Sequence, residues 1–279
     1  MNTYTITPSW LVKNKNELLK GVKNLEKLGF RIVNKKPLFA LPSPEEKAAQ
    51  IHKAFADKKI GLIIARRGGY SSIKALPYID FNLIKRNPKL FAGFSDLSTL
   101  LNAIHERTGI VTLHSPMVVN FEKASRFTVR SFMNAVNGFP EKNLFKGTKV
   151  SVYRRGTATG TLVGGNLVTL TSLIGTKWEI YTAGHVIFLE DVDEKLHQID
   201  RYLTQWALKG KFNGIKGLVL GDFRGIKNKE VWKILSNQIK VNFPVVYCPN
   251  IGHVKDKLTL PIGAKVKLDT RGKQLTISN

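Results

Sequence analysis

A serine and an aspartate stand together where a short apolar run gives way to a helical pattern. They are Ser95 and Asp96, in the stretch LFAGFSDLSTLL at residues 90–101. A serine on a sharp turn between a strand and a helix is the arrangement of the nucleophile in α/β-hydrolases. The G-x-S-x-G spacing of that motif is not met, because Leu97 occupies its last position. The local pattern alone therefore favours another interpretation, in which Ser95 or Asp96 caps the helix that follows.

A serine hydroxyl becomes nucleophilic when a base takes its proton and a carboxylate orients that base. His253 is a candidate base, because it lies in the stretch CPNIGHVKD, after a strand-like run and beside Gly252. The glycine permits a sharp backbone turn, and functional side chains concentrate in such loops. His114 and His185 stand beside strand-like runs and remain open as candidates. The other three histidines fall within helical patterns: His52, His105 and His197.

An acidic cluster follows the apolar run HVIFLE, with Glu190, Asp191, Asp193 and Glu194 within five residues. One interpretation is a solvated loop in which one of the acids caps the next helix. The other is that Glu190 orients the base. The order Ser95, Glu190, His253 matches the serine, acid, histidine order of some hydrolases, although such triads are defined by geometry.

Two glycine pairs offer backbone amides that no side chain obstructs. Gly68 and Gly69, in RRGGYSS, could form an anion site or an oxyanion hole. Gly164 and Gly165, in GTLVGGNL, precede a predicted helix whose N-terminus could bind a phosphate. No lysine-serine pair of the nucleotide-binding loop follows them, so a close backbone turn near the active site is the favoured interpretation.

The elements that must position these residues alternate through the first half of the chain. Apolar spacing predicts a helix over 14–28, and Ser43 with Glu46 forms a capping-box pattern at the start of a second helix. The β-branched run at 60–65 predicts a strand buried on both faces, as in parallel sheets. Further helices are predicted near 97–109 and 126–136, with strands at 89–93 and 110–114. This alternation predicts a parallel α/β sheet.

A glycine-rich stretch near residues 138–150 separates this region from one with more strands. We expect two domains, over residues 1–140 and 150–279, joined by a linker at 141–149. Beyond the linker the patterns predict helices near 166–174, 196–209 and 228–238, and several short strands. The second domain is therefore expected to be α+β with a strand-rich end.

Composition limits the functional classes. The 279 residues include 43% hydrophobic residues and one cysteine, Cys248, which excludes an intramolecular disulfide and a multi-cysteine metal site. No apolar stretch approaches the roughly 18 residues of a membrane span, and no signal-peptide pattern opens the chain, so we expect a soluble cytoplasmic protein. The net charge of +24 comes from lysines spread throughout the sequence. Without a basic arm or a recognition motif, specific nucleic-acid binding is not expected, although the charge could steer anionic substrates.

Taken in order, a set of motifs resembles the LD-carboxypeptidase family of serine peptidases, which includes muramoyltetrapeptide carboxypeptidases and microcin C self-immunity proteins. The set runs through most of the chain and comprises ITPS (6–9), SPEEKAAQIHKAFAD (43–57), ARRGGYSSIKALPYID (65–80), GFSDLSTLL (93–101), LHSPM (113–117), GTLVGGNLVTLTSLIGTKW (160–178), FLEDVDE (188–194), IGH (251–253) and LTLPIGAKVKLD (258–269). Ser71 departs from the family pattern, where a glycine often follows RGGY, and the segment His114, Ser115, Pro116 departs as well.

The resemblance implies an N-terminal Rossmann-like parallel-sheet domain, similar to class I glutamine amidotransferases, and a C-terminal swivelling β-rich domain. It implies that Ser95 is the nucleophile, His253 the general base and Glu190 the orienting acid. The oxyanion hole would use the amide of Asp96 and a glycine amide of the RGGY turn, which we assign to Gly69 over Gly68.

The implied reaction is serine-type hydrolysis of the bond between an L-configured diaminoacid and the terminal D-alanine of murein tetrapeptide, in peptidoglycan recycling. The resemblance implies no metal and no cofactor, and it implies that the protein is a homodimer. Arg67, beside the glycine turn, would anchor a substrate carboxylate. One alternative is hydrolysis of a peptidyl- or aminoacyl-nucleotide of the microcin C type. A second alternative, from another class, is a non-catalytic basic binding protein on the same fold.

Overall fold

The alternating runs of the first half assemble into a six-stranded sheet with the order β11-β5-β4-β3-β1-β2. The computed structural model describes residues 1–278. All pairs in this sheet are parallel except β11 with β5. All four residues of β3 are buried, as expected for a strand covered on both faces. The strands are β1 (Asn2–Ile6), β2 (Arg31–Ile32), β3 (Leu62–Ala65), β4 (Leu90–Gly93), β5 (Thr112–His114) and β11 (Leu260–Ile262).

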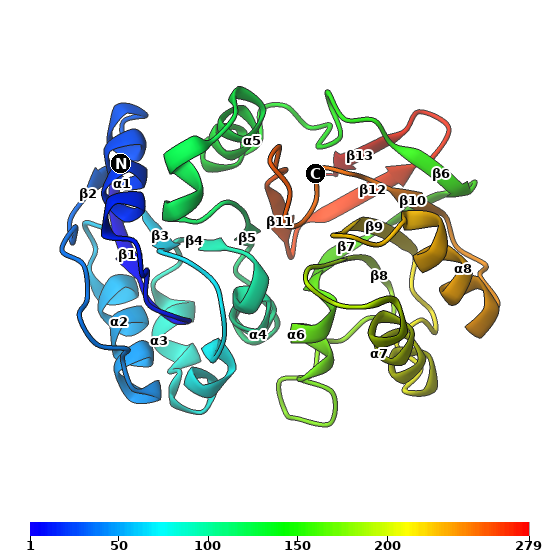
Figure 1. The fold of residues 1–279 in the computed structure, drawn as a ribbon, viewed down its shortest axis with the longest axis horizontal. Helices are drawn as coiled ribbons and strands as arrows, with labels where there is room; N and C mark the ends of the chain where they lie inside the picture. The colour runs from blue at the N-terminus through cyan, green and yellow to red at the C-terminus, as the bar shows by residue number, and fades with distance from the viewer. Residues whose placement is uncertain (279) are drawn as a thin grey trace.

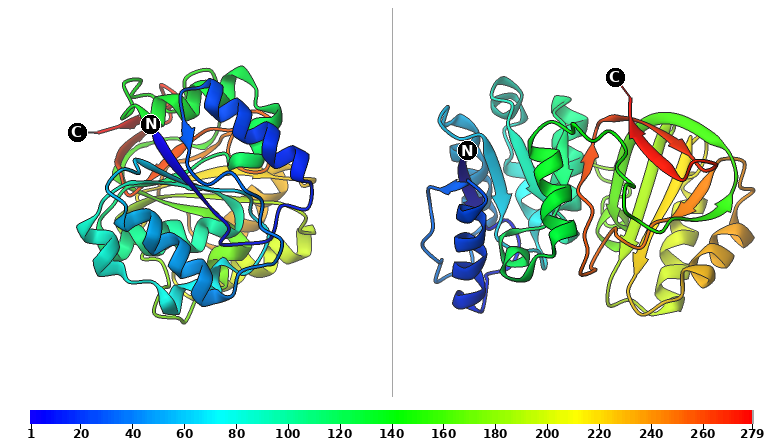
Figure 2. Two further views of the ribbon diagram at one scale, coloured as in Figure 1. Left: turned by 90° about the vertical axis from the view of Figure 1, so that its left-hand side faces the viewer. Right: turned by 90° about the horizontal axis from the view of Figure 1, so that it is seen from above.

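Helices cover both faces of this first sheet, with α1 and α5 on one side and α2, α3 and α4 on the other (Figures 1 and 2). The predicted capping box is present at α2, where Ser43 N donates to Glu46 Oε2 at 2.7 Å and Glu46 N donates to Ser43 Oγ at 3.2 Å. The helices are α1 (Lys15–Lys27), α2 (Pro44–Ala56), α3 (Phe81–Arg86), α4 (Ser98–Thr108) and α5 (Arg126–Val136), with short 3₁₀ segments η1 (Ser72–Tyr78), η2 (Ser95–Leu97) and η3 (Val118–Lys123).

The second half forms a mixed seven-stranded sheet with the order β13-β12-β7-β8-β9-β10-β6. Strands β7, β8, β9 and β10 are parallel to one another, whereas β12 pairs antiparallel with β7 and β13, and β6 pairs antiparallel with β10. The elements are β6 (Ser151–Arg154), β7 (Thr157–Asn166), α6 (Leu167–Thr171), β8 (His185–Asp191), α7 (Leu196–Leu208), β9 (Gly217–Phe223), α8 (Asn228–Gln238), β10 (Val245–Tyr247), β12 (Lys265–Asp269) and β13 (Gln274–Ile277). The protein is thus an α/β protein of two domains, one built on a mostly parallel sheet and the other on a mixed sheet, as predicted.

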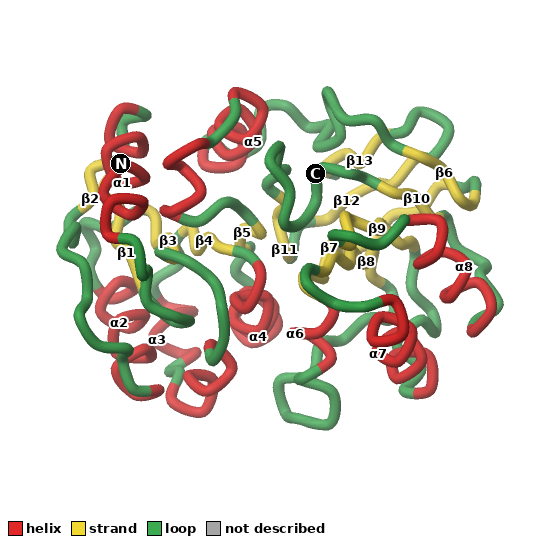
Figure 3. Tube along the Cα trace, in the orientation of Figure 1, coloured by secondary structure: helices red, strands yellow, loops and turns green. Residues whose placement is uncertain are grey.

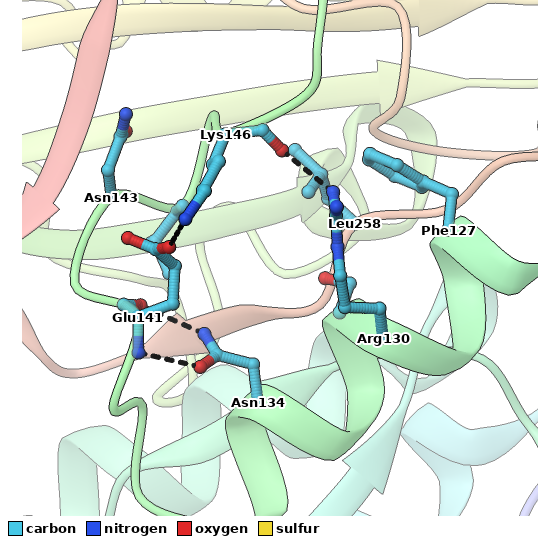
Figure 4. Close-up of a pocket in the computed structure, with 9 residues that line it drawn as sticks. Phe127, Arg130, Asn134, Glu141, Asn143, Lys146 and Leu258 are labelled. Atoms are coloured by element: carbon cyan, nitrogen blue, oxygen red, sulfur yellow. Dashed lines mark hydrogen bonds and ion pairs between the residues drawn. The ribbon is translucent and has the colours of Figure 1, made fainter.

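The chain passes between the two sheets three times. Figure 4 shows the first passage, where α5 holds the linker: Asn134 Nδ2 donates to the Glu141 carbonyl, and Glu141 N donates to Asn134 Oδ1, both at 2.9 Å. Arg130 Nη2 donates to the Lys146 carbonyl at 3.1 Å, and Leu144 N donates to the β13 residue Leu275 at 2.8 Å. The linker is therefore fixed to both domains, and the cavity of about 140 Å³ beside it contains none of the predicted site residues.

The second passage carries the chain from β10 back to the first sheet. Strand β11 pairs with β5 in the register Leu260 to His114, and the chain then returns to the second sheet as β12. Loop lies on both sides of β11 in this crossing (Figure 3). Residues 260–262, which fall in the range expected for the second domain, thus complete the sheet of the first. The stretch before β11 contains His253, so this histidine lies where the two domains meet.

Candidate active site

Ser95 lies directly after β4 on a sharp turn. Its φ is 65°, a left-handed conformation that costs an L-residue roughly 1–2 kcal/mol. The chain folds back so closely that a Cβ atom at Gly93 would lie 2.4 Å from Leu97 Cδ2. Helix α4 has Leu97 as its N-cap and receives no side-chain capping bond. The interpretation of Ser95 or Asp96 as a cap of this helix is therefore wrong, and the turn instead presents the Ser95 hydroxyl.

Three residues far apart in the sequence meet at this turn. The ring nitrogen His253 Nε2 lies 3.0 Å from Ser95 Oγ, and His253 Nδ1 lies 2.9 Å from Glu190 Oε2. An ionised Glu190 accepts a hydrogen bond from Nδ1–H, which leaves Nε2 as an acceptor facing the serine hydroxyl. This arrangement allows the serine proton to pass to the histidine.

Glu190 is completely buried at the end of β8. Burial alone would raise the pKa of this carboxyl, but the adjacent His253 and His114 outweigh it and lower the pKa to about 2. Gly252 allows the close approach, because its φ is 113° and a Cβ atom there would lie 2.7 Å from Glu190 Oε2. The glycine beside the histidine therefore meets two requirements, a left-handed backbone and room for the carboxylate.

A second histidine flanks the carboxylate. His114, at the end of β5, is 2% exposed, and its Nε2 lies 3.9 Å from Glu190 Oε1. That distance is too long for a hydrogen bond, and neither His114 nitrogen has a partner among residues 1–278. The ring packs edge-on against Phe94 and Phe188. The sequence placed His114 only beside a strand; its proximity to Glu190 arises from contact between the two sheets.

The glycine turn faces the serine. A Cβ atom at Gly68 would lie 3.1 Å from Ser95 Cβ and 3.3 Å from Ser95 Oγ. Gly69 has a φ of 128° and contacts the side chain of Trp10. Neither glycine N–H donates to a backbone carbonyl within residues 1–278. The backbone of Gly69 therefore favours glycine, a side chain at Gly68 would crowd Ser95, and both amides lie in the turn that faces Ser95.

The side chain of Asp96 joins this glycine turn to the nucleophile turn. Its Oδ2 accepts hydrogen bonds from Ser72 N, at 2.9 Å, and from Ser9 Oγ, while Ser72 Oγ donates to the Asp96 carbonyl at 2.6 Å. Burial raises the pKa of Asp96. The hydrogen bonds from Ser9 and Ser72 and the nearby charge of Lys47 oppose the rise. Sequence reasoning considered Asp96 as a helix cap or through its backbone amide. It missed the side-chain contacts because they are made with residues 24 and 87 positions away.

Ser71, which departs from the family pattern, is held by a buried lysine. Its φ of 90° is in the region that favours glycine. Lys47 Nζ, on α2, donates to Ser71 Oγ at 2.6 Å. Burial lowers the pKa of Lys47, although nearby Asp96 opposes this. The serine therefore fixes the turn through a side-chain contact that a glycine could not make.

The other acids of the cluster have different surroundings. Asp191 Oδ2 accepts from Val168 N at 2.9 Å, and Asp191 Oδ1 accepts from Asn166 Nδ2 at 3.1 Å. This carboxylate therefore occupies the N-terminus of α6, and the suggested phosphate site there is not formed. Gly164 and Gly165 lie in β7 instead, where Cβ atoms would lie 1.9 Å from the Phe188 carbonyl oxygen and 2.3 Å from Ser98 Oγ.

A cleft of about 460 Å³ opens onto Ser95 and His253. Its lining includes the apolar side chains of Trp10, Phe94, Met117 and Val119. Charged side chains lie around it: Glu17, Arg67, Asp193 and Arg224. Arg67 is thus placed at the cleft, with its Nη1 donating to the Leu11 carbonyl at 3.4 Å. The arrangement suits a substrate that carries both charges and has a compact apolar part beside the reacting bond.

Two features are absent from the part of the chain that the structure describes, a metal-binding cluster and a membrane-spanning helix. Within residues 1–278, no group of three or more histidine, cysteine, aspartate and glutamate side chains is placed to hold a metal ion. None of the helices described in that range is long and apolar enough to cross a membrane.

Family models match both domains. The model of the LD-carboxypeptidase N-terminal domain matches residues 4–115, and that of the LD-carboxypeptidase C-terminal domain matches residues 159–268. Together these matches cover well over half of the chain. The first match contains Ser95 and Asp96, and the second contains Glu190 and His253.

The similar proteins have names of two kinds, carboxypeptidases and microcin self-immunity proteins. A probable murein peptide carboxypeptidase of Bacillus subtilis is 32% identical over 277 residues, covering 91% of this chain and 84% of the relative. The microcin C7 self-immunity protein of Escherichia coli is 26% identical over 310 residues, covering 96% and 89%. Among solved structures, a muramoyltetrapeptide carboxypeptidase from Oxalobacter formigenes superposes with a TM-score of 0.84 at 28% identity, covering 100% of this chain and 99% of that one. An MccF-like protein from Bacillus anthracis gives a TM-score of 0.87 at 26% identity, covering 99% and 96%.

Proposed function

This chain belongs to the LD-carboxypeptidase family, and from that premise we propose that it releases the terminal D-alanine of murein tetrapeptide by serine-type hydrolysis. The bond cleaved joins D-alanine to an L-configured diaminoacid. The observation that carries the proposal is the hydrogen-bonded series Ser95, His253, Glu190 at the cleft. The name of the Bacillus subtilis relative supports the choice of substrate.

In the proposed mechanism, His253 Nε2 accepts the proton of Ser95 as Oγ attacks the carbonyl carbon of the diaminoacid. Glu190 stays ionised and stabilises the imidazolium that forms. The tetrahedral oxyanion is bound by the amides of Asp96 and Gly69, which lie on the two turns that the Asp96 side chain joins. His253 then protonates the leaving nitrogen, and D-alanine departs.

The second half of the reaction removes the acyl group from the serine. A water molecule takes the place of D-alanine, gives a proton to His253 Nε2 and attacks the ester carbonyl. The collapse of the second tetrahedral intermediate returns the proton to Ser95 Oγ and frees the tripeptide. No group besides these side chains and amides is required for the proton transfers.

Charges around the cleft support a peptide substrate that has several carboxylates and an amine. We assign Arg67 to a substrate carboxylate, because it lies beside the glycine turn at the reacting end of the cleft. The net charge of +24 would raise the encounter rate with such anionic peptides. The same proposal places the enzyme in the recycling of peptidoglycan peptides.

A nucleotide conjugate of the microcin C type is the second candidate substrate, favoured by the similarity to the self-immunity protein. That alignment extends over 310 positions although this chain has 279 residues, so the relative contains insertions. The more compact chain favours the murein peptide.

One experiment separates these substrates. Purified protein is incubated with murein tetrapeptide or with a processed peptidyl-nucleotide conjugate, and the products are identified by mass spectrometry, with Ser95→Ala as the control. Loss of one alanine from the tetrapeptide, abolished in the variant, is expected. Cleavage of the conjugate alone would contradict the murein assignment. No acylation of Ser95 together with tight nucleic-acid binding at physiological salt would support a non-catalytic basic binding protein instead.

A further inference from the structure

His253 lies on a loop that closes on itself between β10 and β11. Leu258 N donates to the Asn250 carbonyl at 2.7 Å, and Asn250 Nδ2 donates to the Asp256 carbonyl at 2.9 Å. These two bonds fix the base of the loop but do not reach the histidine. The Glu190 carboxylate orients the imidazole ring itself, so the backbone on either side of His253 is the part that needs a further contact.

Lys257 makes that contact from inside the loop. Its Nζ donates to the Gly252 carbonyl at 3.1 Å and to the Val254 carbonyl at 2.5 Å, which are the residues on either side of His253. The same ammonium lies 4.8 Å from the centre of the Phe94 ring, and the Phe94 ring centre lies 4.8 Å from that of His253. Because Phe94 immediately precedes Ser95, one cation contacts both the backbone beside His253 and the aromatic ring beside Ser95.

The backbone of Lys257 is itself anchored to the first domain. Its N–H donates to Thr128 Oγ1, on α5, at 2.9 Å, and Thr128 Oγ1 donates to the Lys255 carbonyl at 3.2 Å. The ammonium therefore extends from a fixed point, and its hydrogen bonds transmit that position to Gly252 and Val254. An ammonium has three donors, enough for both carbonyls.

We propose that Lys257 is a positioning residue, whose ammonium holds the two carbonyls flanking His253 and so sets the imidazole at reacting distance from Ser95. This inference rests on the proposed serine-type hydrolysis. It assigns Lys257 no contact with the substrate, and the proton transfers remain with Ser95 and His253.

Charged groups from three segments surround the ammonium. Glu190 on β8 and Asp222 on β9 favour its charge, whereas Arg224, which follows β9, disfavours it; His253 stands on the loop itself. Burial is the largest influence and lowers the pKa of Lys257 to about 8. The cation is therefore lost in mildly alkaline solution. A neutral amine still donates hydrogen bonds, but bonds from a charged donor are roughly twice as strong.

The test compares Lys257→Met, Lys257→Arg and the control Lys255→Met, which alters an exposed lysine on the same loop. Release of D-alanine from murein tetrapeptide is measured as kcat and KM across a pH series, alongside the melting temperature of each variant. We expect Lys257→Met to lower kcat by about 10- to 100-fold with little change in KM, since misplacing a base costs rate more than binding. Lys255→Met should match the wild type. A Lys257→Met variant that is folded and keeps its kcat within about twofold would overturn the proposal.

The arginine variant provides a readout that a purely structural role would not alter. As the pH rises through about 8, the wild type should lose kcat, whereas Lys257→Arg should retain its own kcat because guanidinium stays charged. An alkaline decline at the same pH in both proteins would contradict the proposal, and this comparison decides the matter if Lys257→Met fails to fold.

A substrate-independent assay separates this inference from the proposed function. The rate at which a fluorophosphonate probe labels Ser95 is measured in the same proteins, with Ser95→Ala as the blank. Slower labelling of Lys257→Met than of Lys255→Met supports the positioning role even if murein tetrapeptide is not cleaved by the wild type. Equal labelling rates would overturn it, whichever substrate the enzyme proves to use.

Discussion

Ser98 Oγ accepts a hydrogen bond from the backbone N–H of Asn166 at 3.0 Å, and this buried contact joins α4 to the end of β7. Ser98 stands one helical turn after the nucleophile, and Asn166 is paired with Glu190 in the second sheet. The neighbouring Asn102 adds two bonds to Gly164, at 2.8 and 3.2 Å. The spacing between Ser95 and Glu190 is therefore set by direct contact between the domains.

A methyl group at Gly165 should disturb that spacing. A Cβ atom there would lie 2.3 Å from Ser98 Oγ, and the φ of 144° already disfavours a side chain. We expect Gly165→Ala to lower kcat by at least about tenfold, because a shift of about 1 Å between reacting groups has a large cost. The matched control is Gly175→Ala, which also has positive φ (85°) but has nothing within 4 Å. Equal activity of the two variants, measured at equal folded fraction, would contradict this account.

Replacing the nucleophile by glycine should stabilise the fold while abolishing activity. Ser95 has a φ of 65°, which glycine adopts without strain and alanine does not. We expect Ser95→Gly to exceed Ser95→Ala in free energy of unfolding by about 1 kcal/mol, with both at least several orders of magnitude below wild-type turnover. Urea denaturation and the D-alanine release assay measure the two effects. A less stable glycine variant would mean that the turn is not strained.

Truncation of the Asp96 side chain should impair both stability and turnover. Asp96→Ala leaves the buried Ser72 N–H and Ser9 hydroxyl without an acceptor, and each unsatisfied group costs about 1–3 kcal/mol. The released glycine turn should also bind the oxyanion less well, so kcat should fall more than KM rises. Thermal denaturation with steady-state kinetics checks this prediction. Unchanged kcat in a destabilised variant would limit Asp96 to a structural role.

The depressed pKa of Glu190 predicts how stability depends on acid. Its value of about 2 in the folded protein lies below the ordinary 4.5, so Glu190 contributes stability that is present above pH 4.5 and is lost as the pH falls towards 2. Glu190→Gln should lose less stability over this interval than the wild type. In His253→Ala one of the groups that lower the Glu190 pKa is absent, so the loss should be smaller than in the wild type and should be complete at a higher pH. Denaturation midpoints measured from pH 6 to 2 test the order of the three proteins.

Much of the first domain could be predicted because its signals are local. The capping box of Ser43 and Glu46 lies within one helical turn, and the buried run of β3 is contiguous. Strand β11 is different, since its three residues pair with β5 almost 150 residues earlier, and only the folded chain brings them together.

The site shows the same division between local and long-range information. Residue types around Ser95 do not encode its positive φ, so the motif alone favoured a helix cap; the distant Glu190 and His253 and the family resemblance favoured a nucleophile. His114 could not be assigned in this way, because segments from both sheets surround it. The Asp96 side chain could not be assigned either, because its partners Ser9 and Ser72 follow other strands of the first sheet. Lys257 is one lysine among many in the sequence, and nothing in its sequence neighbourhood marks it as partly buried.

The pairing of β11 with β5 has a consequence for synthesis on the ribosome. Strands β1 to β5 emerge first, and residues 112–114 then form an open edge of a largely complete sheet. That edge can gain its last strand only after the whole parallel core of the second sheet has been translated. Unpaired strand edges favour association with other chains, so the nascent chain exposes an aggregation-prone strand edge throughout that interval. The segment that contains β11 pairs with this edge and also brings His253 into place, so shielding of the edge and assembly of the site coincide.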